Sequence, residues 1–387
     1  MELTFWILIF VVFYAYLGYG IFLYLLILIK RLFKSSKTSY SNNYTPSVTH
    51  LIAAFNEEDY IGDKIENSQK LDYPEYLLST FVVTDGSDDQ TASIVKSYKD
   101  IRHTHKPERR GKIAAVDRAM EMVDSEIVIF SDANTDLNRE AVKMIIRHFE
   151  DPKVGAVAGE KRIQNKEKDI AAGAGEGFYW KYESKLKTWD SELYTVVGAA
   201  GELFAVRRSI FESVPKDSII EDFYMTLRIA QRGYRVVYEP EAYAVESSSA
   251  SVGDELKRKI RIAAGGIQSI VRLRGLLNPF KNFLLTFQYV SHRVLRWTLA
   301  PLSLPLIFIL NYFLMPVHPV YEFLFYGQIA FYLLALLGFW LESREIRVKI
   351  LFIPYYFTMM NYAVFMGMGR YFKGSQSVVW EKAKRAS

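Results

Sequence analysis

The sequence contains no cysteine and only six histidines in 387 residues. Without cysteine the chain can form neither disulfide bonds nor thiolate metal sites, and its histidines do not show the spacing of metal ligands. An excess of charge of one sign is also missing, because the formal net charge is only +5. Lysines and arginines gather beside apolar segments, so anionic lipid headgroups suit them better than nucleic acid does.

Apolar residues are abundant but unevenly distributed. They make up 50% of the chain, yet the mean hydropathy is only +0.02, so they must be concentrated in blocks. Residues 4–30 form the first block and carry no charge until Lys30, which exceeds the roughly 20 residues needed to cross a bilayer. A signal peptide is the alternative, but the stretch is too long and lacks a basic flank before it and a small-residue cleavage site after it. We therefore expect a transmembrane helix within residues 1–34.

The charges around this block indicate its orientation. Glu2 precedes it, whereas Lys30, Arg31, Lys34 and Lys37 lie at its other end. Positive residues favour the cytoplasmic side of a membrane. The N-terminus is therefore expected outside, and the polar region that follows in the cytosol, as part of a multi-pass protein of the cell membrane.

The C-terminal part has a different character. Residues 251–297 are basic and rich in aromatics, as in helices that lie in a membrane interface. Residues 298–387 contain three further apolar blocks, near 298–315, 321–341 and 350–368, followed by a basic tail. Four crossings would leave that tail outside, although its charges favour the inside. Either one block is re-entrant or the number of crossings differs by one, and both alternatives stay open.

Between these parts, residues 35–250 read as a cytosolic α/β domain. Short apolar runs alternate with amphipathic stretches, which is typical of a mostly parallel, Rossmann-like sheet with helices on both faces. Ligands bind such sheets beyond the carboxyl ends of the strands. The expected strands are residues 48–54, 77–83, 126–130 and 154–158, and the expected helices are residues 89–98, 112–123, 139–149 and 223–232.

Acidic residues follow two of these strands. Asp85 and Gly86 come directly after the second, where an ordinary strand-to-helix turn is the alternative to a binding site. Asp132 and Asn134 follow the third and leave the strand end on the same side, unless they form no more than a polar turn. Oxygen ligands of this kind suit Mg²⁺ or Mn²⁺, with diphosphate oxygens in the other positions.

A third acidic pair, Glu221-Asp222, begins an expected helix. Such carboxylates can simply cap the helix, or one can act as a general base toward an acceptor hydroxyl. No convincing nucleophile is present, which favours transfer in a single displacement. Arg258 and Arg261 could balance a diphosphate leaving group or bind lipid headgroups, and Lys112 could contact phosphate or be a surface lysine.

In their order along the chain, these motifs resemble the membrane-integrated family 2 glycosyltransferases, which include cellulose, chitin and hyaluronan synthases. The resemblance covers about residues 48–265 and implies a GT-A fold, an inverting mechanism and a nucleotide-sugar donor such as a UDP-sugar. It also implies roles for individual residues. The donor would be bound by Asn56, Glu57, Asp85, Gly86, Lys112, Asp132, Arg258 and Arg261, the metal by Asp132 and Asn134, and the acceptor by Gly201 and Glu202, while Asp222, with Glu221 beside it, would be the catalytic base.

The sequence departs from the family pattern at three places. Asn134 replaces a second aspartate, Ile220 stands where threonine often precedes the Glu-Asp pair, and Ile262 stands where a Gln-x-x-Arg-Trp signature has tryptophan, with Arg258 in place of its glutamine. That tryptophan accompanies processive polymerisation. Elongation of a polysaccharide by a hexosyltransferase is the first functional hypothesis, and transfer of one sugar to a lipid or lipid-linked acceptor is the second. A silent nucleotide-sugar-binding module of a secretion complex is the third.

Overall fold

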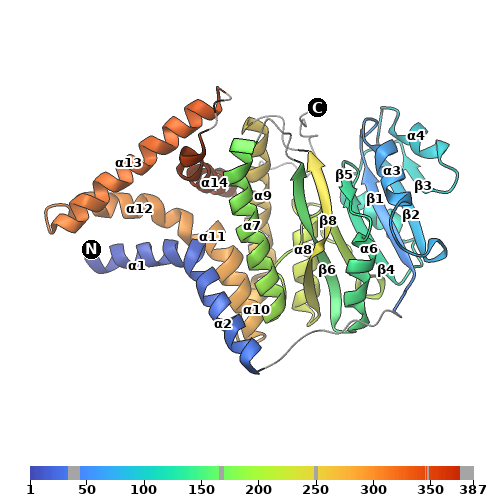
Figure 1. The fold of residues 1–387 in the computed structure, drawn as a ribbon, viewed down its shortest axis with the longest axis horizontal. Coiled ribbons are helices and arrows are strands. Elements are labelled where there is room, and N and C mark those ends of the chain that lie inside the picture. Colours follow the sequence, from blue (N-terminus) through green and yellow to red (C-terminus); the bar gives the residue numbers. More distant parts are fainter. Residues whose placement is uncertain (34–43, 165–169, 248–251, 345, 347, 375–387) are drawn as a thin grey trace.

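The computed structural model describes residues 1–33, 44–164, 170–247, 252–344, 346 and 348–374. Figure 1 shows two regions, a sheet with its covering helices on one side and a group of long helices on the other. Helices α7 (Ile170–Leu193) and α9 (Val252–Arg272) stand between them. A functional site is therefore expected near this junction, beyond the carboxyl ends of the strands.

In the described residues the sheet has eight strands in the order β3-β2-β1-β4-β7-β6-β8-β5. The parallel arrangement predicted from the sequence holds for β3, β2, β1 and β4, and again for β6 with β8. Strand β7 lies antiparallel between β4 and β6, and β5 is antiparallel to β8, so the sheet is mixed. Its strands are β1 (Val48–Ala54), β2 (Leu78–Asp85), β3 (Arg102–Lys106), β4 (Ile127–Asp132), β5 (Thr135–Leu137), β6 (Val154–Gln164), β7 (Leu203–Arg207) and β8 (Arg235–Ser247).

Alternating apolar residues give the sheet a core on each face. In β4, Val128 and Phe130 point into one core, whereas Ile127 and Ile129 point into the other, as the two-residue period of a strand requires. The first core is covered by α5 (Lys112–Met120), α8 (Glu221–Gln231) and α9. The opposite face is covered by α3 (Ile61–Gln69), α4 (Thr91–Ser97) and α6 (Ala141–Ile146). Helices on both faces were expected from the sequence.

The long helices have the composition of membrane spans. Glu2–Phe33, Pro319–Glu342 and Ile350–Phe372 are long and apolar enough to cross a bilayer, and the bent pair Phe283–Trp297 and Leu299–Leu314 would add a fourth span if it acts as one. The higher number, counted over the described residues, equals the four crossings expected from the sequence. The helices are α1 (Glu2–Phe13), the π-helix η1 (Tyr14–Gly18), α2 (Tyr19–Phe33), α10 (Phe283–Tyr289), the π-helix η7 (Val290–Val294), α11 (Leu295–Trp297), α12 (Leu299–Leu314), α13 (Pro319–Glu342) and α14 (Lys349–Phe372).

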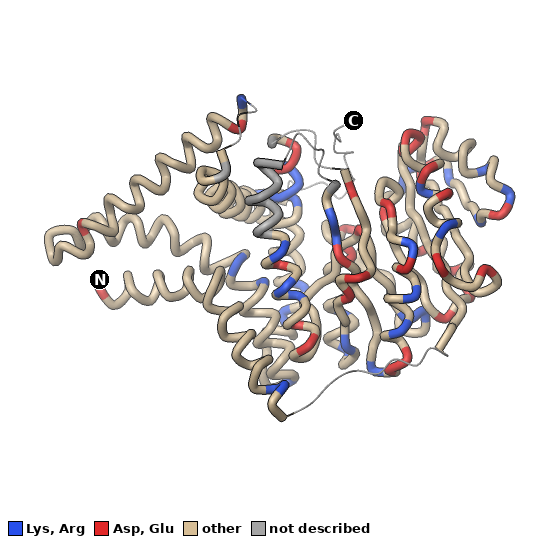
Figure 2. Tube along the Cα trace, viewed as in Figure 1, with Lys and Arg blue, Asp and Glu red and all other residues tan. Residues whose placement is uncertain are grey.

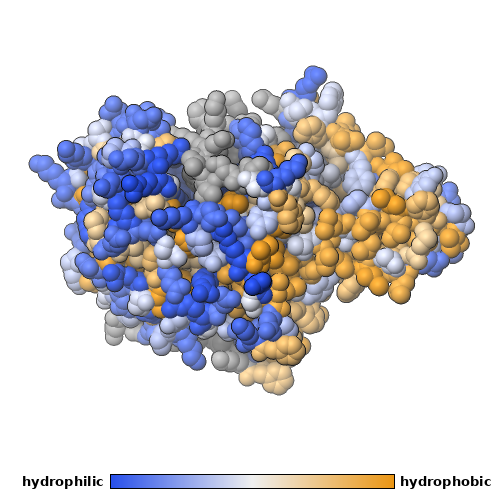
Figure 3. Space-filling model, turned by 180° about the vertical axis from the view of Figure 1, so that it is seen from behind, coloured by the Kyte–Doolittle hydropathy of each residue, from blue (hydrophilic) through white to orange (hydrophobic). Residues whose placement is uncertain are grey.

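The surface of this region is apolar. Figure 2 shows few charged residues along α1, α12 and α13, and Figure 3 shows hydrophobic side chains over the same end of the molecule. Phe10, Phe323 and Leu336 are each more than half exposed. Exposed apolar surface of this extent marks a membrane or protein contact. A lipid environment is therefore the expected surrounding of these helices.

A buried polar cluster joins the N-terminal helix to the rest of the chain. The Tyr19 hydroxyl donates to Asp190 on α7, and His292 Nδ1 lies 2.5 Å from the same carboxylate. Arg296 donates from Nε to the Ala15 carbonyl in η1 at 2.8 Å. A π-helical turn changes the register of the backbone hydrogen bonds, and this guanidinium supplies a donor there. His292, whose role no sequence motif predicts, belongs to this cluster.

Helix α14 packs directly on α9. A Cβ atom added to Gly367 would lie 2.7 Å from Ala263 Cβ and 2.9 Å from the Ile260 carbonyl oxygen. The two helix backbones therefore approach each other at a distance that only glycine permits at this position. This contact places a candidate membrane span against the helix that carries Arg258 and Arg261.

Candidate active site

The loops that follow β1 and β2 are tied together by Asn56. Its backbone is left-handed, with φ at 54°, a conformation that asparagine tolerates better than most residues. The side-chain amide donates to Asp88 Oδ1 at 2.6 Å, and its oxygen accepts from the Asp88 N–H at 3.1 Å. The next residue, Glu57, is buried, and its N–H donates to Thr91 Oγ1 at 2.8 Å. The two strand ends that the sequence assigned to the nucleotide thus form one surface.

Asp85 builds the turn that begins α5. Its Oδ2 accepts the N–H groups of Arg110 and Gly111, both at 2.7 Å, and its Oδ1 lies 3.3 Å from Arg118 Nη1. These bonds hold the loop in front of the helix, so Asp85 determines where Lys112, the first residue of α5, can reach.

Gly86 permits the same loop to come close. Its φ is 70°, and an added Cβ would lie 2.5 Å from Arg109 Cβ. The Arg109 guanidinium in turn stacks over the Phe55 ring at 3.7 Å from its centroid. Gly86, Asp85 and Asn56 lie outside the lining of the pocket described next, so in this conformation they support the loops around it.

A pocket of about 650 Å³ lies between the sheet, α8, α9 and α14. Most of the predicted site residues come together in its lining. They are Glu57, Lys112, Asp132, Asn134, Gly201, Glu202, Glu221, Asp222, Arg258 and Arg261.

Lys112 stands between two carboxylates of this pocket. Its Nζ lies 2.9 Å from Asp132 Oδ1 and 3.0 Å from Glu221 Oε1. Burial disfavours the charged amine, but Asp132 and Glu221 outweigh burial and raise the Lys112 pKa above its ordinary value. The lysine therefore remains a cation and links the end of β4 to the start of α8.

The paired acids at the start of α8 differ in their ionisation. Burial would raise the pKa of Glu221, but Lys112 and the backbone N–H groups of the helix terminus together lower it. Burial, with the neighbouring Glu221 charge, raises the pKa of Asp222 to about 7. An added Cβ at Gly201 would lie 3.3 Å from Asp222 Oδ2, so the glycine leaves room beside this carboxylate. Asp222 can therefore accept a proton near neutral pH.

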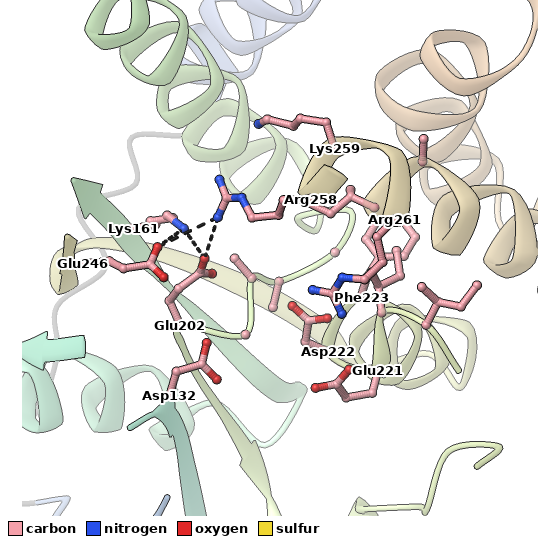
Figure 4. A pocket seen from close by; sticks show the side chains of 18 of the residues that line it. Asp132, Lys161, Glu202, Glu221, Asp222, Phe223, Glu246, Arg258, Lys259 and Arg261 are labelled. Carbon is pink, nitrogen blue, oxygen red and sulfur yellow. Dashed lines mark hydrogen bonds and ion pairs between the residues drawn. The ribbon is translucent and has the colours of Figure 1, made fainter. Parts of the chain in front are cut away.

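Glu202 belongs to a closed ion-pair cluster (Figure 4). Lys161 on β6 is paired with both Glu202 and Glu246, and Arg258 Nη1 lies 3.9 Å from an oxygen of each. Burial opposes ionisation of Glu202, yet Lys161 and Arg258 hold its pKa below the ordinary value. The glutamate predicted to bind the acceptor is thus engaged by Lys161 and Arg258.

Lys161 and Glu246 are two functional-site residues that the sequence does not predict. Neither belongs to a motif, and they meet only because β6 and β8 are neighbouring strands. No local sequence signal marks Lys161, because Glu160 and Arg162 flank it. Only the structure shows that Lys161 and Glu246 are buried, where charged side chains are rarely found without a partner.

Arg258 and Arg261 lie three residues apart on α9, and both line the pocket. Such residues share a helix face. Arg258 is held by Glu255, with Nε 3.2 Å from Glu255 Oε2. Figure 4 shows Arg261 on the side of Asp222 and Arg258 on the side of Lys161. The two guanidinium groups therefore lie in different parts of the same pocket.

The pocket offers few protein ligands for a metal. In the described part of the chain no group of three or more His, Cys, Asp or Glu side chains is placed to hold a metal ion. Asp132 and Asn134 nevertheless line the same pocket, and burial raises the Asp132 pKa although Lys112 opposes it. A cation at this carboxylate would therefore favour its charged form. The donor set fits Mg²⁺ or Mn²⁺, which bind through one or two protein oxygens and complete their coordination with phosphate and water.

The chain is similar to known glycosyltransferases. A family model described as "Glycosyl transferase family 2" matches residues 49–214. A poly-beta-1,6-N-acetyl-D-glucosamine synthase from Staphylococcus aureus (strain MSSA476) is 30% identical over 236 residues, which are 58% of this chain and 56% of that protein. The synthase of the same name from Staphylococcus epidermidis is 27% identical over 232 residues, with the same shares. The chain thus matches little more than half the length of these relatives.

A solved structure resembles nearly the whole chain. It is a mannosyltransferase from Pyrobaculum calidifontis in complex with GDP-Man and Mn²⁺, with a TM-score of 0.70, 23% identity, and coverage of 96% of this chain and 100% of that one. At this identity the likeness concerns the fold. The chain therefore contains a domain, residues 49–214, that matches glycosyl transferase family 2. It has a GT-A-like fold and is homologous to poly-beta-1,6-N-acetyl-D-glucosamine synthases.

Proposed function

We propose that this chain transfers a glycosyl group from a nucleoside-diphosphate sugar to a hydroxyl of a membrane-associated glycan, with inversion at the anomeric carbon. The observation that carries the proposal is Asp222, whose pKa is raised to about 7 in a pocket that also contains Asp132 and Lys112. A base is most effective when its pKa lies near the working pH.

The reaction is a single displacement. The acceptor oxygen attacks the anomeric carbon while the bond from that carbon to the diphosphate oxygen breaks. The hydroxyl proton passes to the Asp222 carboxylate, and the nucleoside diphosphate leaves with the electron pair of the broken bond. Arg261 and Arg258 offset the negative charge of the leaving group. A divalent cation, when bound at Asp132 and Asn134, would neutralise diphosphate charge in the same region.

The donor is proposed to be a UDP-sugar. The surface formed by Asn56, Glu57, Asp85 and Gly86 would bind the nucleotide, and Lys112 would reach toward its phosphates. The relatives named as poly-beta-1,6-N-acetyl-D-glucosamine synthases support UDP-N-acetylglucosamine as the first donor to test.

The acceptor is proposed to be a growing polysaccharide at the membrane. Met360, Ala363 and Val364 of α14, a candidate membrane span, belong to the wall of the same pocket. This apolar wall also supports a second candidate, the transfer of one sugar to a lipid-linked acceptor. In both cases the sheet domain lies in the cytosol, and Gly201 and Glu202 border the acceptor.

To test the proposed activity, the purified full chain in lipid is incubated with a panel of UDP-, GDP- and ADP-sugars and with Mg²⁺ or Mn²⁺. Free nucleotide and product mass are then measured. Metal-dependent release of UDP with a glycosylated product is expected. Release of no nucleotide from any donor would contradict the transferase and leave a binding module. Product length separates polysaccharide elongation from single transfer.

A further inference from the structure

The middle of α9 carries two consecutive glycines that two different neighbours approach. An added Cβ at Gly265 would lie 2.8 Å from Ile220, and one at Gly266 would lie 2.5 Å from the Trp297 ring. Glycine inside a helix costs about 1 kcal/mol relative to alanine. At these two positions, the close packing of neighbouring side chains against the helix offsets this cost. At Gly266 the Trp297 ring lies directly on the helix backbone.

Trp297 is in contact with the residue next to the proposed base. Its ring packs edge-to-face on Phe223, with centroids 5.2 Å apart and an interplanar angle of 67°. Phe223 follows Asp222 and lies over Gly198, where an added Cβ would be 2.1 Å from the Phe223 ring. The two rings are therefore fixed, one against Gly266 and the other against Gly198.

Both rings line the pocket, and Trp297 is only half-buried. Trp297 ends α11, directly before Thr298, where the chain bends by 49° into α12. Ile262 also lines this wall but offers an aliphatic side chain. The pocket's other tryptophan, Trp180, has Lys259 Nζ 5.4 Å from its ring centroid. The half-buried Trp297 and the buried Phe223 thus form an aromatic pair next to Asp222, in a lining that also contains Tyr60.

From this geometry we infer that Trp297, with Phe223, is the surface on which the acceptor sugar packs while its hydroxyl faces Asp222. This inference rests on the proposed function and narrows its acceptor to a pyranose unit with an apolar C–H face. Aromatic rings bury such faces and orient them. An acceptor without a sugar, such as a bare lipid phosphate, would gain nothing from these rings. The aromatic side chain that the sequence lacks at position 262 is supplied by another helix.

The experiment compares Trp297→Ala and Trp297→Phe with the wild-type full chain in native membranes. The matched control is Trp340→Ala, because Trp340 lies on α13 and is more than half exposed. Labelled UDP-N-acetylglucosamine is supplied, and both sugar transfer and donor hydrolysis are counted. For Trp297→Ala the ratio of transfer to hydrolysis should fall about tenfold, whereas Trp297→Phe, which keeps a ring, should retain most of it. Trp340→Ala should match the wild type.

A second arm titrates short β-1,6-linked N-acetylglucosamine oligomers as added acceptors. Trp297→Ala should raise the acceptor KM about tenfold and change the donor KM by less than about twofold. An unchanged transfer-to-hydrolysis ratio would overturn the inference. So would a parallel fall of transfer, hydrolysis and melting temperature, because that is the signature of a packing residue. A wild-type chain that consumes none of the UDP-, GDP- and ADP-sugars would instead refute the proposed function itself.

Discussion

Asp222 and Glu221 are neighbours in sequence, yet their surroundings favour opposite protonation states. Lys112 lies 3.0 Å from Glu221 and stabilises its charge. Asp222 experiences burial and the adjacent Glu221 charge, which outweigh the weaker attraction of Lys112. Pairs of acids whose pKa values are driven apart commonly divide the tasks of an active site. Here Glu221 remains an anion, and Asp222 is the residue that exchanges a proton.

Replacing the base tests this division. Asp222→Asn should reduce sugar transfer by about 10²–10⁴-fold while donor binding survives, as measured by transfer rate and by nucleotide-sugar titration. Transfer at the wild-type rate would exclude Asp222 as the base. Glu202→Gln serves as the comparison, since it removes a pocket carboxylate that is paired with Lys161.

The same variant has a stability signature. The folded pKa of Asp222, about 7, lies above its ordinary value of 3.8. The folded state therefore holds a proton that the unfolded state has lost between these pH values, and stability falls as pH rises through this window. An asparagine at this position does not ionise, so Asp222→Asn removes this loss of stability. The variant should therefore melt at a higher temperature than the wild type near pH 8, and the difference in melting temperature should shrink toward about pH 5.

The pH dependence of transfer provides a separate prediction. The wild-type rate should rise through about pH 7 as Asp222 loses its proton. Lys112 lowers the Asp222 pKa, so Lys112→Met should weaken transfer and move the midpoint of the rate profile to higher pH. Rates measured at saturating donor across a pH series determine both midpoints. A common midpoint would show that Lys112 does not influence the base.

At the scale of elements, the contact between α9 and α14 is decided by one glycine. An added Cβ at Gly367 would lie 2.8 Å from the Ala264 backbone nitrogen and 2.9 Å from the Ile260 carbonyl oxygen. Main-chain atoms of a helix cannot move aside as the end of a side chain can. Gly367 therefore permits α14, which carries the pocket residues Met360, Ala363 and Val364, to pack closely on α9.

Gly367→Ala should consequently destabilise the chain by about 1–3 kcal/mol through overpacking. Gly369→Ala, two residues along the same helix, is the matched control because an added Cβ there meets nothing within 4 Å. Its stability should be unchanged or higher, since alanine favours a helix by up to about 1 kcal/mol. Melting temperatures in the same detergent measure both, and equal values would show that the helices separate easily.

At the scale of the whole molecule, the sheet domain and the long apolar helices together form the pocket. The buried cluster of Tyr19, Asp190 and His292 fastens α2 to α7 and η7, and α14 completes the pocket wall. Sugar transfer is therefore expected at the membrane surface, with the sheet on the cytosolic side.

The absence of native cysteine makes this orientation directly measurable. Glu2→Cys and Lys153→Cys place single thiols at exposed positions, one at the N-terminus and one before β6. A membrane-impermeant maleimide should label Glu2→Cys in intact cells, and should label Lys153→Cys only after permeabilisation, because positive residues follow the first span. The reverse pattern would invert the proposed topology.

Much of the fold could be read from local sequence. The apolar runs around Leu51, Val82 and Ile129 became β1, β2 and β4, and the Glu221-Asp222 pair begins a helix as expected. Strand β7 was missed, and its antiparallel direction depends on where the preceding chain returns to the sheet. Strand β3 was missed because its residues, Arg102–Lys106, are mostly polar and lie at the sheet edge.

For the candidate site, too, some features follow from the local sequence and others only from the tertiary structure. By itself the sequence determined the acidic strand ends, the helix start at the Glu221-Asp222 pair and the apolar blocks, because each depends on a few consecutive residues and their hydrogen-bonding or solvation needs. Only the tertiary structure decided that Lys161 meets Glu246, that Lys112 bridges Asp132 and Glu221, and that Trp297 stands beside Phe223. These contacts join residues far apart in the chain. Their formation depends on strand pairing and helix packing, which no local pattern encodes.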